Sequence, residues 1–132
     1  MTTRRVFLHI GAIKTGTTYI QTVLRENRDR LIEEGVLFPG RRWRSQVRAV
    51  EDVLRLGRTR DGRPIPTPRP WPRLVEEIRS FGGDTAVVSM EWLSYARPAQ
   101  VRSIVSSLAP AEVRVVLTLR DATATVPAVW QT

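Results

Sequence analysis

The chain has 132 residues, the length of one ordinary domain, and such a domain can bury about two-thirds of its unfolded surface. Hydrophobic residues make up 42% and charged residues 26%, which is typical of a globular protein rather than a disordered tail. The lack of cysteine excludes disulfides, thiolate metal sites and cysteine nucleophiles, and a single histidine argues against zinc, so we expect no metal. No apolar run approaches the roughly 18 residues of a membrane-spanning helix, so we expect no membrane span.

The formal net charge is +8, and the excess lies in the middle of the chain. Residues 41–80 carry eleven arginines against five acidic residues. A cationic surface suggests an anionic partner, which would be a nucleic acid, a phosphate-bearing cofactor or an acidic polymer. All but one of the 21 basic residues are arginine, which we attribute to codon bias in a GC-rich genome. The one lysine, Lys14, therefore stands out.

The first residues bear a superficial likeness to a twin-arginine export signal, because Arg4-Arg5 precede an apolar run. That run contains His9, stops at Ile13 and is followed by Lys14, whereas a signal peptide needs an uninterrupted apolar stretch and a small-residue cleavage site. We interpret the segment as a strand and expect a cytoplasmic protein.

The first forty residues predict a strand and two helical stretches. Residues 6–10 form a short apolar run that ends at Gly11, which is typical of a buried parallel strand. A helical pattern follows over residues 20–24, and a second stretch around Leu31 ends at Gly35, a plausible C-cap. Residues 36–40 read as an extended piece closed by a turn.

The middle of the chain is less regular. Residues 41–56 are arginine-rich and allow a helix. Residues 57–72 contain five prolines and two glycines, so we interpret them as a loop or linker. Leu74, Val75 and Ile78 indicate another helix that ends near residue 82.

The last third predicts two further strands with a helix between them. The strands are expected over residues 85–90 and 113–119, and the helix begins at Pro98, a favourable first helical residue. Helical character resumes after Arg120. This alternation predicts a three-layer α/β fold, with a parallel sheet flanked by helices.

Three polar features follow the expected strands, and binding sites in such sheets lie at the carboxyl ends of strands. They are residues 11–18, residues 89–94, and the pair Arg120-Asp121.

The loop over residues 11–18 joins a strand to a helix start, where backbone N–H groups suit a phosphate. Lys14 adds a positive charge, and three threonines add hydroxyl groups. The Walker A pattern would place lysine directly after the second glycine, but that position is Thr17, so this is a phosphate loop of a different design. The alternative is an ordinary glycine turn in which a threonine caps the helix.

Residues 6–21, with their core of Lys14, Thr15, Gly16, Thr17 and Thr18, resemble the phosphosulfate-binding loop of sulfotransferases. The segments over residues 27–31 and 35–40 resemble bacterial members of that family. The resemblance implies a P-loop-like fold and transfer of a sulfuryl group from 3'-phosphoadenosine 5'-phosphosulfate (PAPS) to a hydroxyl or amine. It further implies that Lys14 contacts the sulfuryl group and the bridging oxygen, and that the turn over residues 15–18 binds the 5' phosphate.

The resemblance also implies a general base at the end of the second long strand, and Glu91 matches in position and chemistry. The alternative is that Glu91 caps a helix or pairs with an arginine. His9 is a rival base, although inside a strand it is expected to be packed or hydrogen-bonded.

Arg120, at the end of the last strand, resembles the arginine that holds the 3' phosphate in that family. The serine that the family has eight residues later is Ala128 here, so one hydroxyl contact is missing or comes from elsewhere. An ordinary salt bridge between Arg120 and Asp121 is the alternative.

The arginines of residues 41–69, together with Trp43 and Trp71, could bind an acidic or sugar acceptor, because tryptophan stacks on sugars and arginine binds anions. We favour the interpretation of a solvated surface.

Sulfotransferase domains are usually about twice this long and need more strands than the three counted here. We therefore interpret residues 1–132 as the truncated N-terminal part of a single domain, of open oligomeric state. Whether such a fragment is active, and which small-molecule or carbohydrate acceptor it takes, stays open.

Two other functions remain. A kinase-like phosphoryl transferase would keep the loop, but the lysine position and the lack of a clear Walker B aspartate argue against it, Asp121 being the nearest candidate. A basic nucleic-acid-binding module would use the middle arginines, but no known recognition pattern is visible.

Overall fold

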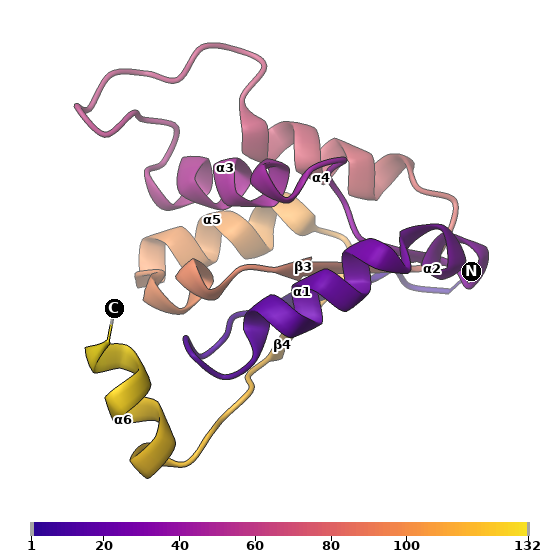
Figure 1. The fold of residues 1–132 in the computed structure, drawn as a ribbon. Helices are drawn as coiled ribbons and strands as arrows, with labels where there is room; N and C mark the ends of the chain where they lie inside the picture. The colour runs from indigo at the N-terminus through magenta and orange to yellow at the C-terminus, as the bar shows by residue number, and fades with distance from the viewer. Residues whose placement is uncertain (1, 132) are drawn as a thin grey trace.

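A computed structural model describes residues 2–131 (Figure 1). This part of the chain forms four parallel strands, six α-helices and one short 3-10 helix, which confirms the predicted α/β class. In chain order the elements are β1 (Arg5–His9), α1 (Thr17–Glu26), α2 (Arg28–Glu33), β2 (Val36–Leu37), α3 (Trp43–Leu54), α4 (Pro70–Ser80), β3 (Thr85–Ser89), η1 (Glu91–Tyr95), α5 (Pro98–Leu108), β4 (Glu112–Val116) and α6 (Ala122–Trp130).

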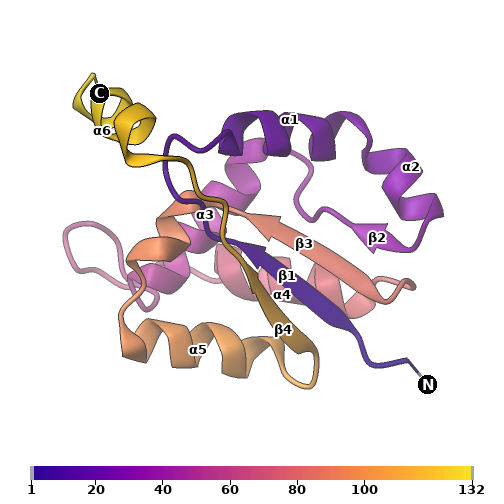
Figure 2. The same ribbon diagram turned by 90° about the horizontal axis from the view of Figure 1, so that it is seen from below.

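The strand order in the sheet is β2-β3-β1-β4. The chain runs from β1 to the far edge at β2, returns to β3, and then crosses to the opposite edge at β4. Because such crossovers are right-handed, this reversal puts α1 and α2 on one face of the sheet and α3, α4 and α5 on the other. Figure 2 shows α1 and α2 following one another on one side of the sheet, with α5 on the other side. The arrangement is consistent with a three-layer α/β domain.

The main core lies between the sheet and the layer of α3, α4 and α5. Val6 and Leu8 of β1 pair with Ala86 and Val88 of β3, and all four side chains are buried on the same face. Apolar residues of the three helices at helical spacing cover them: Ala49, Val50, Val53, Leu74, Val75, Ile78, Ile104 and Leu108. This amphipathic packing fixes the position of β1 and β3, whose carboxyl ends carry the candidate site.

Two strands differ from the sequence prediction in number and length. The piece expected to be merely extended contains β2, which pairs in parallel with β3 and makes a fourth strand. The strand expected over residues 113–119 is shorter, ends at Val116 and lies at the sheet edge, so Val115 is 61% exposed and Leu117 is 51% exposed.

Within residues 2–131, the structure contains no helix with the length and apolar character that a membrane crossing requires.

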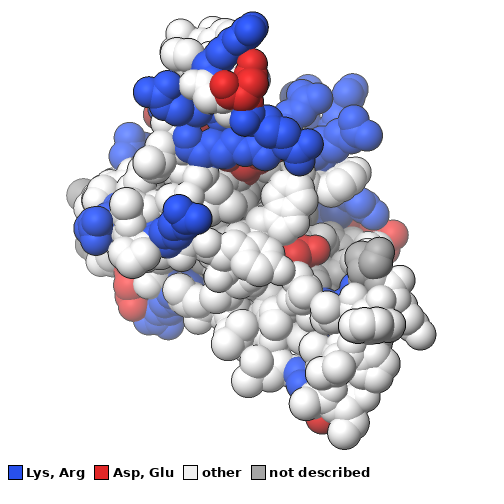
Figure 3. Space-filling model, turned by 90° about the vertical axis from the view of Figure 1, so that its left-hand side faces the viewer, with Lys and Arg blue, Asp and Glu red and all other residues white. Residues whose placement is uncertain are grey.

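The segment between α3 and α4 is shorter and more ordered than the predicted loop over residues 57–72. The last two prolines of the predicted loop, Pro70 and Pro72, belong instead to the first turn of α4, where proline is well tolerated. Lys and Arg side chains gather at the top of Figure 3, where the segment between α3 and α4 lies. The part formed by α6, at the bottom of the same view, is mostly uncharged.

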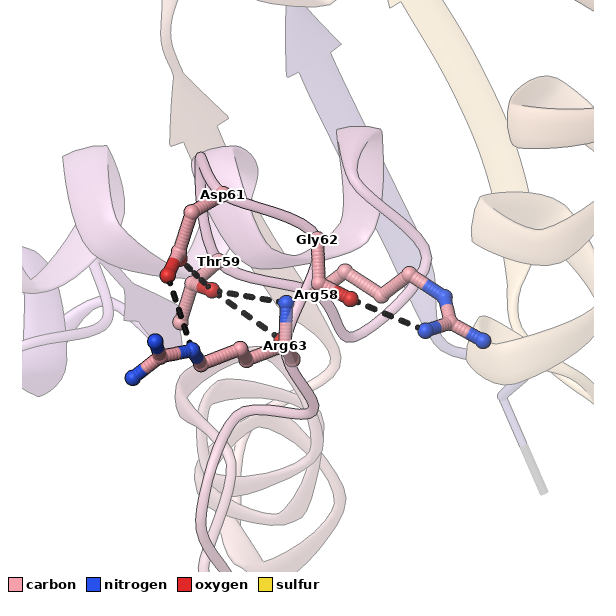
Figure 4. A network of polar contacts seen from close by, with 5 residues as sticks. All are labelled: Arg58, Thr59, Asp61, Gly62 and Arg63. Carbon is pink, nitrogen blue, oxygen red and sulfur yellow. Dashed lines mark hydrogen bonds and ion pairs between the residues drawn. The ribbon is translucent and has the colours of Figure 1, made fainter.

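Hydrogen bonds and ion pairs tie this loop together. Arg63 donates its backbone N–H to Thr59 Oγ1 and pairs with Asp61, while Arg58 donates to the Gly62 carbonyl (Figure 4). At its end, Arg69 Nε lies 3.0 Å from Oδ1 of the buried Asp52. Much of the positive charge of this loop is therefore compensated inside the protein.

Candidate functional site

The candidate site lies where the neighbouring strands β1 and β3 end. Because the segments after these strands leave toward opposite faces of the sheet, a crevice opens between them. Gly11, directly after β1, has a φ of +100°, and a Cβ placed on it would come within 3.2 Å of Glu91 Cβ. A side chain at this position would therefore be strained and crowded. The glycine lets the loop after β1 and the start of η1 approach closely.

The loop leads into α1 through left-handed backbone conformations at Lys14 (φ 58°) and Gly16 (φ 83°). Such a conformation is uncommon for a residue with a side chain, and it curls backbone N–H groups toward one spot that suits an anion. Gly16 is the N-cap of α1, and no side chain caps this helix start. The alternative of a threonine cap is therefore not what the structure shows, and the backbone donors of the first turn remain available to a ligand.

Thr118 lies just after β4, the strand beside β1, and forms hydrogen bonds with this loop. Its backbone N–H donates to the Gly11 carbonyl at 2.7 Å, and its hydroxyl donates to the same oxygen at 2.9 Å. Thr15 donates to the Ala12 carbonyl at 2.5 Å and lies 2.8 Å from Thr118 Oγ1. Thr15 therefore holds the loop shape, while Lys14 and Thr18 stay exposed.

Arg120 reaches the loop from the other side. Its Nη1 donates to the Lys14 carbonyl at 3.5 Å, which brings two positive side chains to one end of the sheet. The alternative pairing with Asp121 does not occur among the ion pairs of residues 2–131. Asp121 instead caps α6, accepting from the backbone N–H of Ala124 at 3.0 Å. Hydrogen bonds from Thr123 and then Ala124 lower the pKa of Asp121.

Glu91 is half-buried at the start of η1 and faces the same crevice. Its Oε2 accepts from Gln21 Nε2 at 3.2 Å, and Gln21 also donates to the Ser89 carbonyl. Neither alternative for Glu91 is seen: the side chain caps no helix, and it joins none of the ion pairs in the described chain. An amide partner leaves the carboxylate able to accept a proton.

His9 lies beneath the crevice with only 3% of its surface exposed. Nδ1 is 2.7 Å from Ser89 Oγ, and Nε2 is 3.2 Å from Thr118 Oγ1, so both ring nitrogens have partners. Burial lowers the pKa of His9, while the negative charge of Glu91 opposes that shift. This surrounding makes His9 a positioning residue for the loop and a poor candidate for the base.

A cavity of about 400 Å³ adjoins the crevice. Its walls are α1, the loop after β2, the start of α3 and the end of β3, and Glu91 is among the lining residues. Gln46 of α3 joins these walls, because its side chain donates to the Pro39 carbonyl and accepts from the Ser89 backbone, both at 2.9 Å. A cavity of this size suits a small-molecule ligand.

Sequence reasoning missed Gln21, Gln46 and Thr118. For Gln46, a polar residue on the apolar face of α3 was the available signal. The hydrogen bonds that tie the three residues to the ends of β1 and β3, however, join positions 43 to 107 residues apart along the chain. Trp71, considered as a sugar platform, is 3% exposed and donates to Ser107, so it is a core residue. No group of three or more His, Cys, Asp or Glu side chains within residues 2–131 is arranged to hold a metal ion.

The structure thus brings Lys14, the turn over residues 15–18, Glu91 and Arg120 to one end of the sheet. Comparison of the chain with family models, curated proteins and solved structures found no match. Any functional assignment therefore depends on the chemistry of these side chains and on the loop pattern.

Proposed function

We propose that this chain carries the donor site and the base of a P-loop-like sulfotransferase, which moves a sulfuryl group from PAPS to a hydroxyl or amine acceptor. One observation carries the proposal. The uncapped start of α1, the cations Lys14 and Arg120, and the carboxylate Glu91 converge at the carboxyl ends of the three adjacent strands β3, β1 and β4. A polyanionic donor fits the cationic part, and an acceptor proton fits the carboxylate.

The donor would lie along the loop. The 5' phosphate would accept from the first backbone N–H groups of α1 and from Thr18, whose side chain is exposed. Arg120 would hold the 3' phosphate, because a guanidinium binds phosphate through two parallel hydrogen bonds. Ala128, on α6, supplies no hydroxyl for that phosphate.

The transfer requires one proton acceptor and one cation. As the acceptor oxygen or nitrogen bonds to sulfur, the bond from sulfur to the bridging oxygen of the 5' phosphate breaks, and its electron pair stays on that oxygen. Glu91 takes the proton of the acceptor, a role worth about 100- to 10,000-fold in rate. Lys14 stabilises the charge that develops on the leaving oxygen.

The alternatives have less support. A phosphoryl transferase would need a Walker B aspartate, but the carboxylate of Asp121 is engaged as the cap of α6. A nucleic-acid module would use the middle arginines, but Arg55, Arg63 and Arg69 each pair with an acidic side chain.

We also propose that this chain is the N-terminal part of a larger domain. The support is the exposed apolar surface along and after β4, where Leu119 is 78% exposed and Val115 is 61% exposed. An edge strand with such a surface is normally covered. Further strands and helices would cover it.

A thermal melt followed by circular dichroism tests donor binding. The desulfated product, 3'-phosphoadenosine 5'-phosphate, at 100 times its dissociation constant should add about 2.7 kcal/mol to the free energy of unfolding. That is a shift of several degrees for a domain of this size. Lys14→Ala and Arg120→Ala should fold normally and lose most of the shift. An unchanged melting temperature for the unsubstituted protein, or an equal shift with magnesium and ATP, would reject the donor assignment.

A further inference from the structure

The cavity beside Glu91 has a polar wall. Thr18, Gln21, Thr22 and Arg25 follow the i, i+3, i+4, i+7 spacing, so one continuous polar stripe of α1 faces it. These side chains supply hydrogen-bonding groups for a polar ligand in the cavity.

The cavity wall carries opposite charges at two places. Gln21 contacts Glu91, and Arg25 lies four residues farther along α1, about 6 Å away from Gln21 in the axial direction. Arg42 joins Arg25 on the cavity wall. Neither arginine takes part in the ion pairs found within residues 2–131. An anionic group is therefore favoured at the arginine end and disfavoured beside Glu91.

A third arginine that lines the cavity, Arg28, is used within the protein itself. It donates to the carbonyls of Phe38 and Gly40, and its guanidinium lies 5.8 Å from the centre of the Phe38 ring. These contacts hold the loop after β2 in place and so shape the cavity. Arg25 and Arg42 remain for a ligand.

Trp43, next to Arg42 at the start of α3, lines the same cavity and is 59% exposed. An indole that is left in water at a cavity mouth offers a flat apolar face for the ring of a sugar. The cavity therefore combines a stacking surface, two arginines without acidic partners, and a carboxylate at the far end.

We propose that this cavity binds an acidic saccharide, whose ring stacks on Trp43 and whose carboxylate or sulfate group contacts Arg25 and Arg42. This orientation presents a sugar hydroxyl to Glu91. The inference rests on the proposed function for its catalytic meaning, because the saccharide would be the sulfuryl acceptor. Its binding chemistry depends only on the cavity.

Isothermal titration calorimetry without any donor tests the binding. The probe is a hyaluronan tetrasaccharide, and the uncharged control sugar of the same length is a chitotetraose. Both are titrated at about 0.15 M salt, which screens the nonspecific electrostatic attraction of an anion to a cationic protein. We expect the acidic probe to bind at least about tenfold more tightly than the neutral one, and Arg42→Ala and Trp43→Ala each to weaken it by about five- to tenfold. Arg25→Ala should act like Arg42→Ala and provides a second variant.

Arg44→Ala is the matched control, because Arg44 is an exposed α3 arginine outside the cavity wall. Its affinity should stay within about twofold of the parent protein. Equal losses for Arg42→Ala and Arg44→Ala, equal binding of the two probes, or no binding would overturn the inference.

Lys14→Ala separates the two proposals, since Lys14 does not line the cavity. This variant should lose the response to the desulfated donor and keep saccharide binding. An unsubstituted protein that binds the saccharide but shows no response to the desulfated donor would overturn the proposed function alone. A normal donor response without saccharide binding would overturn only this inference.

Discussion

Two sets of arginines in this chain have opposite surroundings. Around the loop between α3 and α4, Arg55, Arg63 and Arg69 each pair with an acidic side chain. Around the crevice and its cavity, Arg25, Arg42 and Arg120 join none of the ion pairs of the described chain, and Arg120 donates to the Lys14 carbonyl. The first set holds the protein's own structure, whereas the second leaves its charge for a ligand. The amino-acid composition alone does not distinguish arginines that stabilise the fold from arginines that are free to bind a ligand.

This difference predicts that substitutions in the crevice reduce function while substitutions in the loop reduce stability. The largest effect is expected for Glu91→Gln, which keeps the contact with Gln21 but removes the proton acceptor. Sulfuryl transfer should fall about 100- to 10,000-fold, because that is the usual contribution of a positioned general base. A transfer assay with labelled PAPS, using an extended form of the protein if this chain alone is inactive, measures the rate.

The stabilisation of Glu91→Gln by the desulfated donor should match that of the parent protein. Glu33→Gln, on the exposed surface of α2, provides the control and should retain full activity. If Glu91→Gln transferred sulfuryl groups at the parent rate, another group would have to be the base.

A smaller effect, on stability, is expected for Arg69→Ala. The Asp52 carboxylate is 1% exposed and accepts from Arg69 Nε and from the Trp71 backbone N–H, each at 3.0 Å. Removing one partner of a buried ion pair leaves a charge without compensation, so we expect the free energy of unfolding to drop by about 3 kcal/mol. Urea denaturation monitored by tryptophan fluorescence provides the measurement.

Arg63→Ala is the matched comparison for Arg69→Ala. Arg63 pairs with Asp61 at the same 3.0 Å, but the two side chains are 83% and 60% exposed. Such a pair contributes less than about 1 kcal/mol. Equal losses in the two variants would show that burial does not distinguish these ion pairs.

The sequence predicted the parallel α/β fold because its elements depend on local patterns. The buried strand β1, the glycine turn and the amphipathic helices α3, α4 and α5 follow from short-range spacing. The strand β2 was missed, because two residues are too few to show a period. The position of β4 at the sheet edge could not be predicted either, since a strand's place in the sheet depends on partners far away in the chain.

The same limit applied to the site. Residues 14–18 could be proposed as a binding loop from the sequence because they form a contiguous motif. The supports Gln46 and Thr118 were not, because each acts on a segment that only the fold brings near. Trp43 and Trp71 looked alike in the sequence, yet one lies at the cavity and the other in the core.

The smallest expected effect concerns His9, the neutral polar side chain under the crevice. Burial lowers its pKa below the ordinary 6.5, so the unfolded chain takes up a proton more readily than the folded protein. The free energy of unfolding should therefore fall as the pH drops below about 6.5, and level off below the folded-state pKa. Because the chain has one histidine, His9→Gln should remove this decline, as urea midpoints at successive pH values would show. A proton NMR titration of the imidazole in the unsubstituted protein gives the pKa directly, and a value above 6.5 would mean that Glu91 outweighs burial.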